Sequence, residues 1–157
     1  MTEIRKPKVK VSERPAVKYA ASAADKVAKE GEKALKTVAQ TQRELGTKYA
    51  RERIKSCGIK GKDAKAAGAV FMALLSELSV DYNIIEDTSR RFVAHTTECP
   101  FLEEWKNTGA DASKLCESFG KSFVQGLCDA VNPKLKYTVS RTMSGESSYC
   151  EEKIELT

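Results

Sequence analysis

The chain has 157 residues, of which 41% are hydrophobic and 31% are charged, and its net charge at pH 7 is +5. This length suits one domain with a hydrophobic core, and no run approaches the roughly 18 consecutive apolar residues that a membrane span needs. The basic first segment, MTEIRKPKVKVSERP, is not followed by an apolar stretch. We therefore expect no secretory signal and predict a cytoplasmic protein.

Residues 1–15 form a basic segment that we expect to be extended. Residues 1–20 contain six Lys and Arg against two Glu, so most of the surplus positive charge lies at this end. A nucleic-acid-binding domain usually carries its basic patch on the folded body, beside aromatic residues, and this chain has no such module. We do not expect nucleic acid as a partner, and the segment is either a solvated tail or an arm for an acidic protein.

Residues 16–57 are rich in Ala, Lys, Glu and Gln, which favour helix. Apolar residues recur there at three- and four-residue steps and form a thin stripe: Val17, Ala20, Ala24, Val27, Ala34, Leu35 and Val38. Gly31 and Gly46 are the points where this helical arm is expected to break. Because alanine buries little area, we expect the arm to lie against a partner or the domain surface rather than to form the core.

Residues 62–157 alternate between helical and strand patterns. Helices are predicted over 63–78 and 112–131, and two pairs of strands are predicted, VDYNIIED with RFVAHTTE and LKYTVSRTM with YCEEKIEL. Single hairpins are unstable alone, so the pattern predicts an α+β domain. Its four-stranded antiparallel sheet is built from two hairpins with helices packed on it, and the long Ala/Lys-rich helical arm precedes it.

Four side chains from separate predicted elements form the candidate site. His95 lies in a strand, Cys99 just beyond its end, Cys116 near the start of a helix and Cys150 in the last strand. Such positions can converge in a small α+β domain, and three cysteines with one histidine are a known zinc ligand set. The sequence predicts a site for zinc or another transition metal, with an iron–sulfur cluster as the alternative.

The cysteines also have simpler interpretations. Their number, five, is odd, which argues against a complete disulfide framework. Free cysteine is among the residue types most often buried, and Cys128 fits that role best, whereas Cys57 beside a glycine is expected to be a surface thiol. For Cys116, the interpretation that competes with the metal site is a small buried hydrophobic side chain beside Leu115 and Phe119.

A second chemical interpretation makes one thiol a nucleophile. Cys99 would be activated by His95, because a thiolate is the reactive form and a neighbouring imidazole can take its proton. Glu98 or Glu152 would then serve as a further acid or base. No local protease-like signature supports this alternative, and no catalytic residue is assigned.

The run ECPFLEEW, the helix with Cys116 and the segment DAVNPKLKYTVSRTMSGESSYCEEKIEL resemble the L-2-amino-thiazoline-4-carboxylic acid hydrolase-like family. The segment is also distantly similar to the 4-vinyl reductase-type small-molecule-binding domains. The resemblance covers about residues 62–157, and it implies that Cys99, Cys116 and Cys150 are the functional cysteines.

Two functions follow as expectations. The first is a domain that binds a metal or metallocofactor and senses or acts on a small molecule, as a metal-dependent hydrolase of a C–N bond would. The second is a non-catalytic accessory subunit, or a redox or ligand sensor, that docks on a larger complex. In that case a protein partner binds through residues 1–56.

Overall fold

The computed structural model describes residues 15–145 and 147–157, so the predicted basic tail at residues 1–15 lies almost wholly outside them. The helices are α1 (Pro15–Glu30), α2 (Glu32–Cys57), α3 (Ala64–Glu77), α4 (Leu102–Asn107), α5 (Ala112–Leu115) and α6 (Ser122–Val131). A π-helical segment, η2 (Cys116–Lys121), joins α5 to α6, and a 3-10 turn, η3 (Met143–Gly145), follows β3. The strands are β1 (Tyr82–Asp87), β2 (Arg91–Thr96), β3 (Leu135–Arg141) and β4 (Cys150–Leu156).

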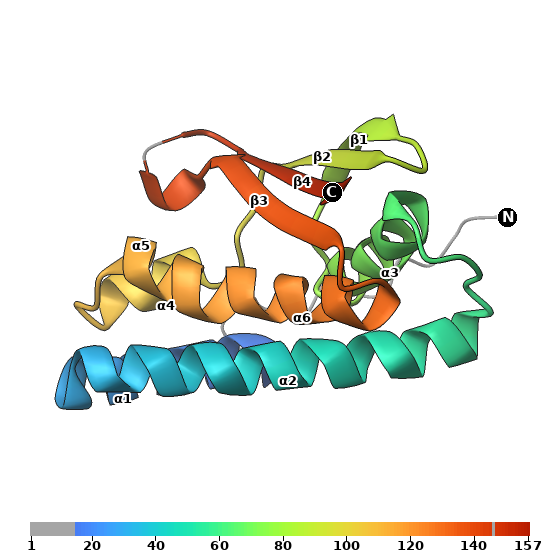
Figure 1. Ribbon diagram of the computed structural model, residues 1–157. Helices are drawn as coiled ribbons and strands as arrows, with labels where there is room; N and C mark the ends of the chain where they lie inside the picture. Colours follow the sequence, from blue (N-terminus) through green and yellow to red (C-terminus); the bar gives the residue numbers. More distant parts are fainter. Residues whose placement is uncertain (1–14, 146) are drawn as a thin grey trace, which may run out of the picture.

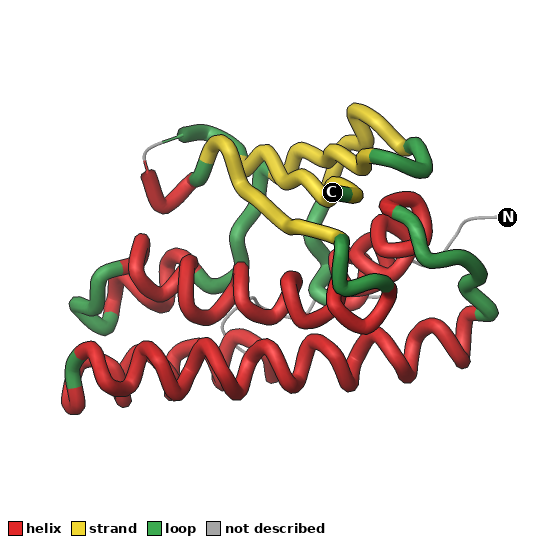
Figure 2. The backbone as a smooth tube through the Cα atoms, in the orientation of Figure 1, coloured by secondary structure: helices red, strands yellow, loops and turns green. Residues whose placement is uncertain are grey.

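The four strands form one antiparallel sheet in the order β1-β2-β4-β3. The hairpins β1–β2 and β3–β4 are therefore joined through β2 and β4, whose pairing is also antiparallel. Figures 1 and 2 show the sheet on one side, α4, α5 and α6 beneath it, and α2 on the far side of those helices. This arrangement confirms the predicted α+β class and the two-hairpin sheet.

The register of the two central strands decides which side chains face the helices. Thr96 pairs with Cys150, and His95 pairs with Glu151. Because successive side chains in a strand point to opposite faces, Thr96 and Cys150 face the helices while His95 and Glu151 face away from them. Ile154, fully buried on β4, shares the inner face with Cys150.

Helices α2 and α6 approach each other closely because each has a glycine at the contact. A Cβ built at Gly46 would overlap the Phe123 carbonyl, and one at Gly126 would overlap the Arg43 carbonyl. The Thr47 hydroxyl donates a hydrogen bond of 2.9 Å to the Gly126 carbonyl across the same contact. Gly46 therefore lies inside a continuous α2, and the predicted break there is wrong.

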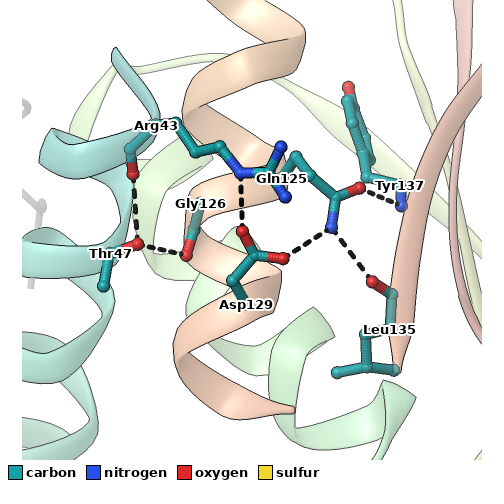
Figure 3. A network of polar contacts seen from close by, with 7 residues as sticks. All are labelled: Arg43, Thr47, Gln125, Gly126, Asp129, Leu135 and Tyr137. Atoms are coloured by element: carbon teal, nitrogen blue, oxygen red, sulfur yellow. Dashed lines mark hydrogen bonds and ion pairs between the residues drawn. The ribbon is translucent and has the colours of Figure 1, made fainter. Parts of the chain in front are cut away.

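A polar network continues from this contact to the sheet (Figure 3). Arg43 on α2 donates to Asp129 on α6 at 2.7 Å, and the Gln125 amide also donates to Asp129 at 3.0 Å. Gln125 then bonds the backbone of β3 twice, donating to the Leu135 carbonyl and accepting from the Tyr137 N–H, both at 3.0 Å. Strand β3, and with it Tyr137, is thus fixed to α6.

The predicted arm is helical, and its apolar stripe from Ala20 to Val38 packs within the chain. Ala20, Ala24 and Val38 form a second cluster with Trp105 from α4, separate from the main core under the sheet. The Trp105 Nε1–H donates to the Ala20 carbonyl at 3.2 Å. Gly31, with φ of 73°, separates α1 from α2 and lets the two helices fold back on each other.

The remaining elements agree with the sequence in most places. Asp63 caps α3 by accepting a hydrogen bond of 2.9 Å from the Ala66 N–H. Helix α4 lies between the second predicted strand and the helix predicted over 112–131, where the sequence predicted no helix or strand. The helix predicted over 112–131 is present, but its middle is π-helical. In the part of the chain that the structure describes, no helix is both long and apolar enough to cross a membrane.

Candidate functional site

An apolar cavity of about 250 Å³ lies between the inner face of the sheet and the helices. Its walls come from α3, η2, α6 and the inner faces of β3 and β4, and α1 and α2 also border it. The apolar lining includes Phe71, Leu74, Leu75, Leu78, Val80, Phe101, Trp105, Phe119, Val124 and Val139. Tyr19 and Leu45 border the cavity and are 47% and 39% exposed, so it reaches the molecular surface beside them.

The structure brings the three predicted cysteines together on this cavity. Cys99 follows β2, Cys116 begins η2 and Cys150 begins β4, and all three line the cavity. Each of them is partly buried. The other two cysteines behave as their simpler interpretations predict, since Cys128 is fully buried in the main core and Cys57 is exposed.

His95 does not join the cysteines. Its Nε2 lies 2.8 Å from a Glu151 carboxylate oxygen on the outer face of the sheet. Its ring also packs on Tyr149, with 4.6 Å between the ring centroids. Strand alternation explains the difference, because Thr96, the next residue, is the one that faces the cavity. His95 therefore does not belong with the three cysteines as a fourth ligand, as had been expected.

The expected metal-binding function is also wrong. Within residues 15–145 and 147–157, no group of three or more His, Cys, Asp or Glu side chains is arranged to hold a metal ion. The expected ligands were Cys99, Cys116 and Cys150 with His95, and His95 lies on the other face of the sheet. The cavity is mostly apolar, which suits an uncharged ligand better than a dication.

The thiols of the cavity are protonated at neutral pH. Burial, with smaller contributions from nearby Cys116 and Cys150, raises the pKa of Cys99 to about 11. Burial likewise raises the pKa of Cys116 and of Cys150. The hypothesis of a Cys99 thiolate activated by His95 is therefore wrong, since the imidazole faces away and the thiol is not acidified.

One polar group lies in the apolar wall. Glu152 faces the cavity between Cys150 and Ile154 on the inner side of β4. The Tyr137 hydroxyl donates to its Oε1 at 2.7 Å, and the Thr96 hydroxyl donates to its Oε2 at 3.0 Å. Burial raises the pKa of Glu152 to about 6 in spite of these two hydrogen bonds. Glu98, the other carboxylate considered from the sequence, also borders the cavity.

A second polar side chain is buried at the opposite wall. Gln42 on α2 is 4% exposed and borders the cavity. Its Nε2 donates to the Phe119 carbonyl in η2 at 3.4 Å, while its Oε1 is buried without a hydrogen-bond partner. A buried unpartnered acceptor is unusual in proteins, and π-helical turns occur often at functional sites.

Sequence reasoning missed Gln42, Thr96 and Tyr137 as members of the site. A signal existed for the first, because Gln42 continues the four-residue steps of the buried stripe from Ala34 and Val38. Tyr137 alternates in phase with apolar neighbours, so its hydroxyl looked like part of the core. Thr96 gave no signal of its own.

Comparison with known proteins gives a fold. No family model matches the chain, and no curated protein matches it in sequence. Among solved structures, the chain is similar to a trafficking protein particle complex subunit 3 from Naegleria fowleri, which was crystallised covalently bound to palmitic acid. The TM-score is 0.62 with 12% sequence identity, over 90% of this chain and 95% of the other.

These comparisons correct two expectations. The resemblance to thiazoline-carboxylate hydrolases and 4-vinyl reductase-type domains finds no support in any family model, and the similar structure is a trafficking-complex subunit instead. The expected metal-dependent hydrolase loses its basis with that resemblance and with the missing metal cluster.

Proposed function

We propose that the protein is a non-catalytic subunit of a protein complex, and that its cavity holds a long acyl chain joined to a cavity cysteine. The observation that carries this proposal is an apolar cavity bordered by three thiols. The fold adds support, because a subunit with the same fold carries palmitic acid covalently. Similarity of fold alone does not determine function, so the proposal depends mainly on the chemistry of the cavity.

That chemistry suits an acyl chain in two ways. Each methylene buried against the Leu, Val and Phe side chains contributes about 0.8 kcal/mol, so a long chain is held firmly without polar contacts. A thioester on Cys99, Cys116 or Cys150 is uncharged and needs no counter-ion in this apolar site. In the exchange with an acyl thioester, the cavity thiol loses its proton, its sulfur takes the acyl group, and the donor leaves as a free thiol. Because the cavity thiols are protonated at neutral pH, binding of the acyl chain beside the thiol offsets the small thiolate fraction.

The test is the intact mass of the purified full chain before and after treatment with hydroxylamine, which cleaves thioesters. We expect one added acyl group that hydroxylamine removes. Single Cys→Ser variants at 99, 116 and 150 identify the attachment site, since only one should abolish the added mass. Cys57→Ser, on the surface, is the matched control and should retain it. Unmodified mass in the wild type, before and after incubation with a long-chain acyl thioester, would contradict the proposal.

The protein partner is proposed to bind the arm from outside. The inner faces of α1 and α2 are buried in the chain, so the expected docking through residues 1–56 is limited to their outer surface. Purification from native cells should lose the partner when exposed Lys48 and Arg51 on α2 are changed to Glu. Lys136→Glu, on the outer face of the sheet, is the control. Equal retention by both variants would reject docking through α2. We place this assembly in the cytoplasm.

A further inference from the structure

Glu152 is an unusual residue for an acyl-binding cavity. It lies on β4, in the interior of the sheet between β2 and β3, and its side chain faces the cavity. A carboxylate here would meet the head of any ligand that enters as far as the inner face of the sheet.

The hydrogen bonds of Glu152 do not neutralise the negative charge of its ionised carboxylate. Tyr137 and Thr96 each donate one hydrogen bond, and both are neutral. No ion pair in the described part of the chain involves Glu152. Lys121 borders the cavity but pairs with Glu117, and His95 pairs with Glu151 on the other face. An ionised carboxylate without a cation is costly to bury.

The remaining groups around Glu152 do not supply a charge that would offset it. The titratable side chains on the elements that border the same cavity are Tyr19 on α1, Glu98 and Cys99 after β2, Cys116 and Lys121 in η2, Tyr137 on β3 and Cys150 on β4. Burial keeps the cavity thiols and the phenol of Tyr137 protonated, since it raises the pKa of each. Lys121 is the one cation among these cavity-bordering residues, and its ammonium is engaged by Glu117.

We propose that Glu152 makes the cavity selective for apolar ligands without a negative charge and excludes free fatty acids at neutral pH. This inference rests on the proposed acyl-binding function. A second carboxylate in the same apolar site would force two like charges together or require uptake of a proton. A thioester-linked acyl group or a long-chain alcohol carries no such charge, and an alcohol can donate a hydrogen bond to Glu152.

Gln42 favours the same ligand class. Its unpartnered Oε1 accepts hydrogen bonds and cannot donate them. The Gln42 Oε1 and the Glu152 carboxylate are therefore both acceptors once Glu152 ionises, which it does near neutral pH because burial raises its pKa only to about 6. Ligand groups that donate are favoured over groups that only accept.

The experiment compares three ligands of equal chain length by displacement of Nile red, an uncharged dye, from the full chain after hydroxylamine treatment. Dodecan-1-ol, dodecanoate and dodecylamine are titrated at about pH 5 and about pH 8, on either side of the transition of Glu152. We expect the alcohol to bind equally at both pH values within about two-fold, and dodecanoate to bind about ten-fold or more weakly at the higher pH. Dodecylamine should show the opposite trend, binding more tightly when Glu152 is ionised.

Matched variants separate the role of Glu152 from ionisation of the ligand itself. Glu152→Gln should reduce the pH effect on dodecanoate by about ten-fold and abolish the amine trend. Glu151→Gln, one position away on the outer face, should behave as wild type. An unchanged pH effect in Glu152→Gln would overturn the inference. If that variant fails to fold, wild-type trends in the same direction for acid and amine would overturn it instead. Failure of all three ligands to displace the dye at either pH would refute the acyl-binding function itself.

Discussion

The hydroxyl of Tyr137 on β3 donates a hydrogen bond of 2.7 Å to Glu152 on the neighbouring strand β4, and both side chains border the apolar cavity. This pair places an ionisable group inside the main core, where the Tyr137 ring also packs against Phe71 in a tilted arrangement, with 6.1 Å between the ring centroids. The polar end of the cavity is therefore built by the sheet itself, through the pairing of its second hairpin.

The pH dependence of stability should report this buried carboxyl. The pKa of Glu152 is raised from 4.5 in the unfolded chain to about 6 in the folded state. Around these values the folded state binds more protons, so the free energy of unfolding falls by about 2 kcal/mol in total as the pH rises from well below 4.5 to well above 6. The favourable contribution of protonated Glu152 is complete below that window and lost above it.

Urea unfolding of wild type and Glu152→Gln across this pH range checks the prediction. The difference between the two curves isolates the effect of Glu152 from that of other titrating groups. One of these is Glu151, whose pKa is lowered to about 2, first by its hydrogen bond from Ser140 and then by its hydrogen bond with His95. Parallel curves would show that the Glu152 carboxyl is hydrated rather than buried.

The contact between α2 and α6 should not tolerate a methyl group. Gly46→Ala and Gly126→Ala each place a Cβ against a backbone carbonyl of the other helix, so we expect a loss of about 1–3 kcal/mol in the free energy of unfolding. Gly120→Ala is the control, because a Cβ there meets nothing within 4 Å and alanine favours helix. Chemical denaturation of the three variants gives the comparison, and equal stabilities would mean that the helices are less closely packed.

Helix α1 should depend on Trp105 for its position. Trp105→Phe removes the hydrogen bond to the Ala20 carbonyl and part of the buried surface, and we expect a loss of about 1–2 kcal/mol. Amide hydrogen exchange should rise mainly in α1 and leave the sheet unchanged. Tyr19→Phe, which keeps its ring near Phe119, is the control. Uniformly faster exchange over the whole chain would indicate global destabilisation rather than release of α1.

Thiol modification should follow exposure and pKa. Cys57 is exposed and should react first with iodoacetamide, whereas Cys128 is fully buried and should react last. After hydroxylamine treatment, Cys99, Cys116 and Cys150 should react at an intermediate rate, which an excess of dodecan-1-ol lowers by filling the cavity. Peptide mass mapping at several times gives the order. Protection of Cys57 by the alcohol would show that the effect does not come from the cavity.

Much of the fold could be predicted because it follows from local patterns. Strand alternation gave both hairpins, and the four-residue steps gave the long helices. The same alternation, applied with the pairing register of β2 and β4, would have placed His95 outside, but that register depends on tertiary packing. Gly46 was interpreted as a helix breaker since its packing partner on α6 is some eighty residues away.

The sequence predicted that three cysteines lie close together, but it did not predict the apolar character of the cavity that they border. Cys99, Cys116 and Cys150 do line one cavity, as their positions in the predicted elements suggested. Residue types alone favoured a metal, because Cys with His is a common ligand set. The apolar walls, and the burial of the Glu152 carboxyl among them, result from the way α3 and η2 pack under the sheet. No short sequence motif predicts that packing.

The most direct test of the acyl-binding proposal is an electron-density map of the purified full chain, prepared without hydroxylamine. We expect elongated density along the cavity beside Phe71 and Val124, continuous with the sulfur of Cys99, Cys116 or Cys150. A cavity filled by ordered water, or closed by collapse of these side chains, would contradict the proposal that it holds an acyl chain.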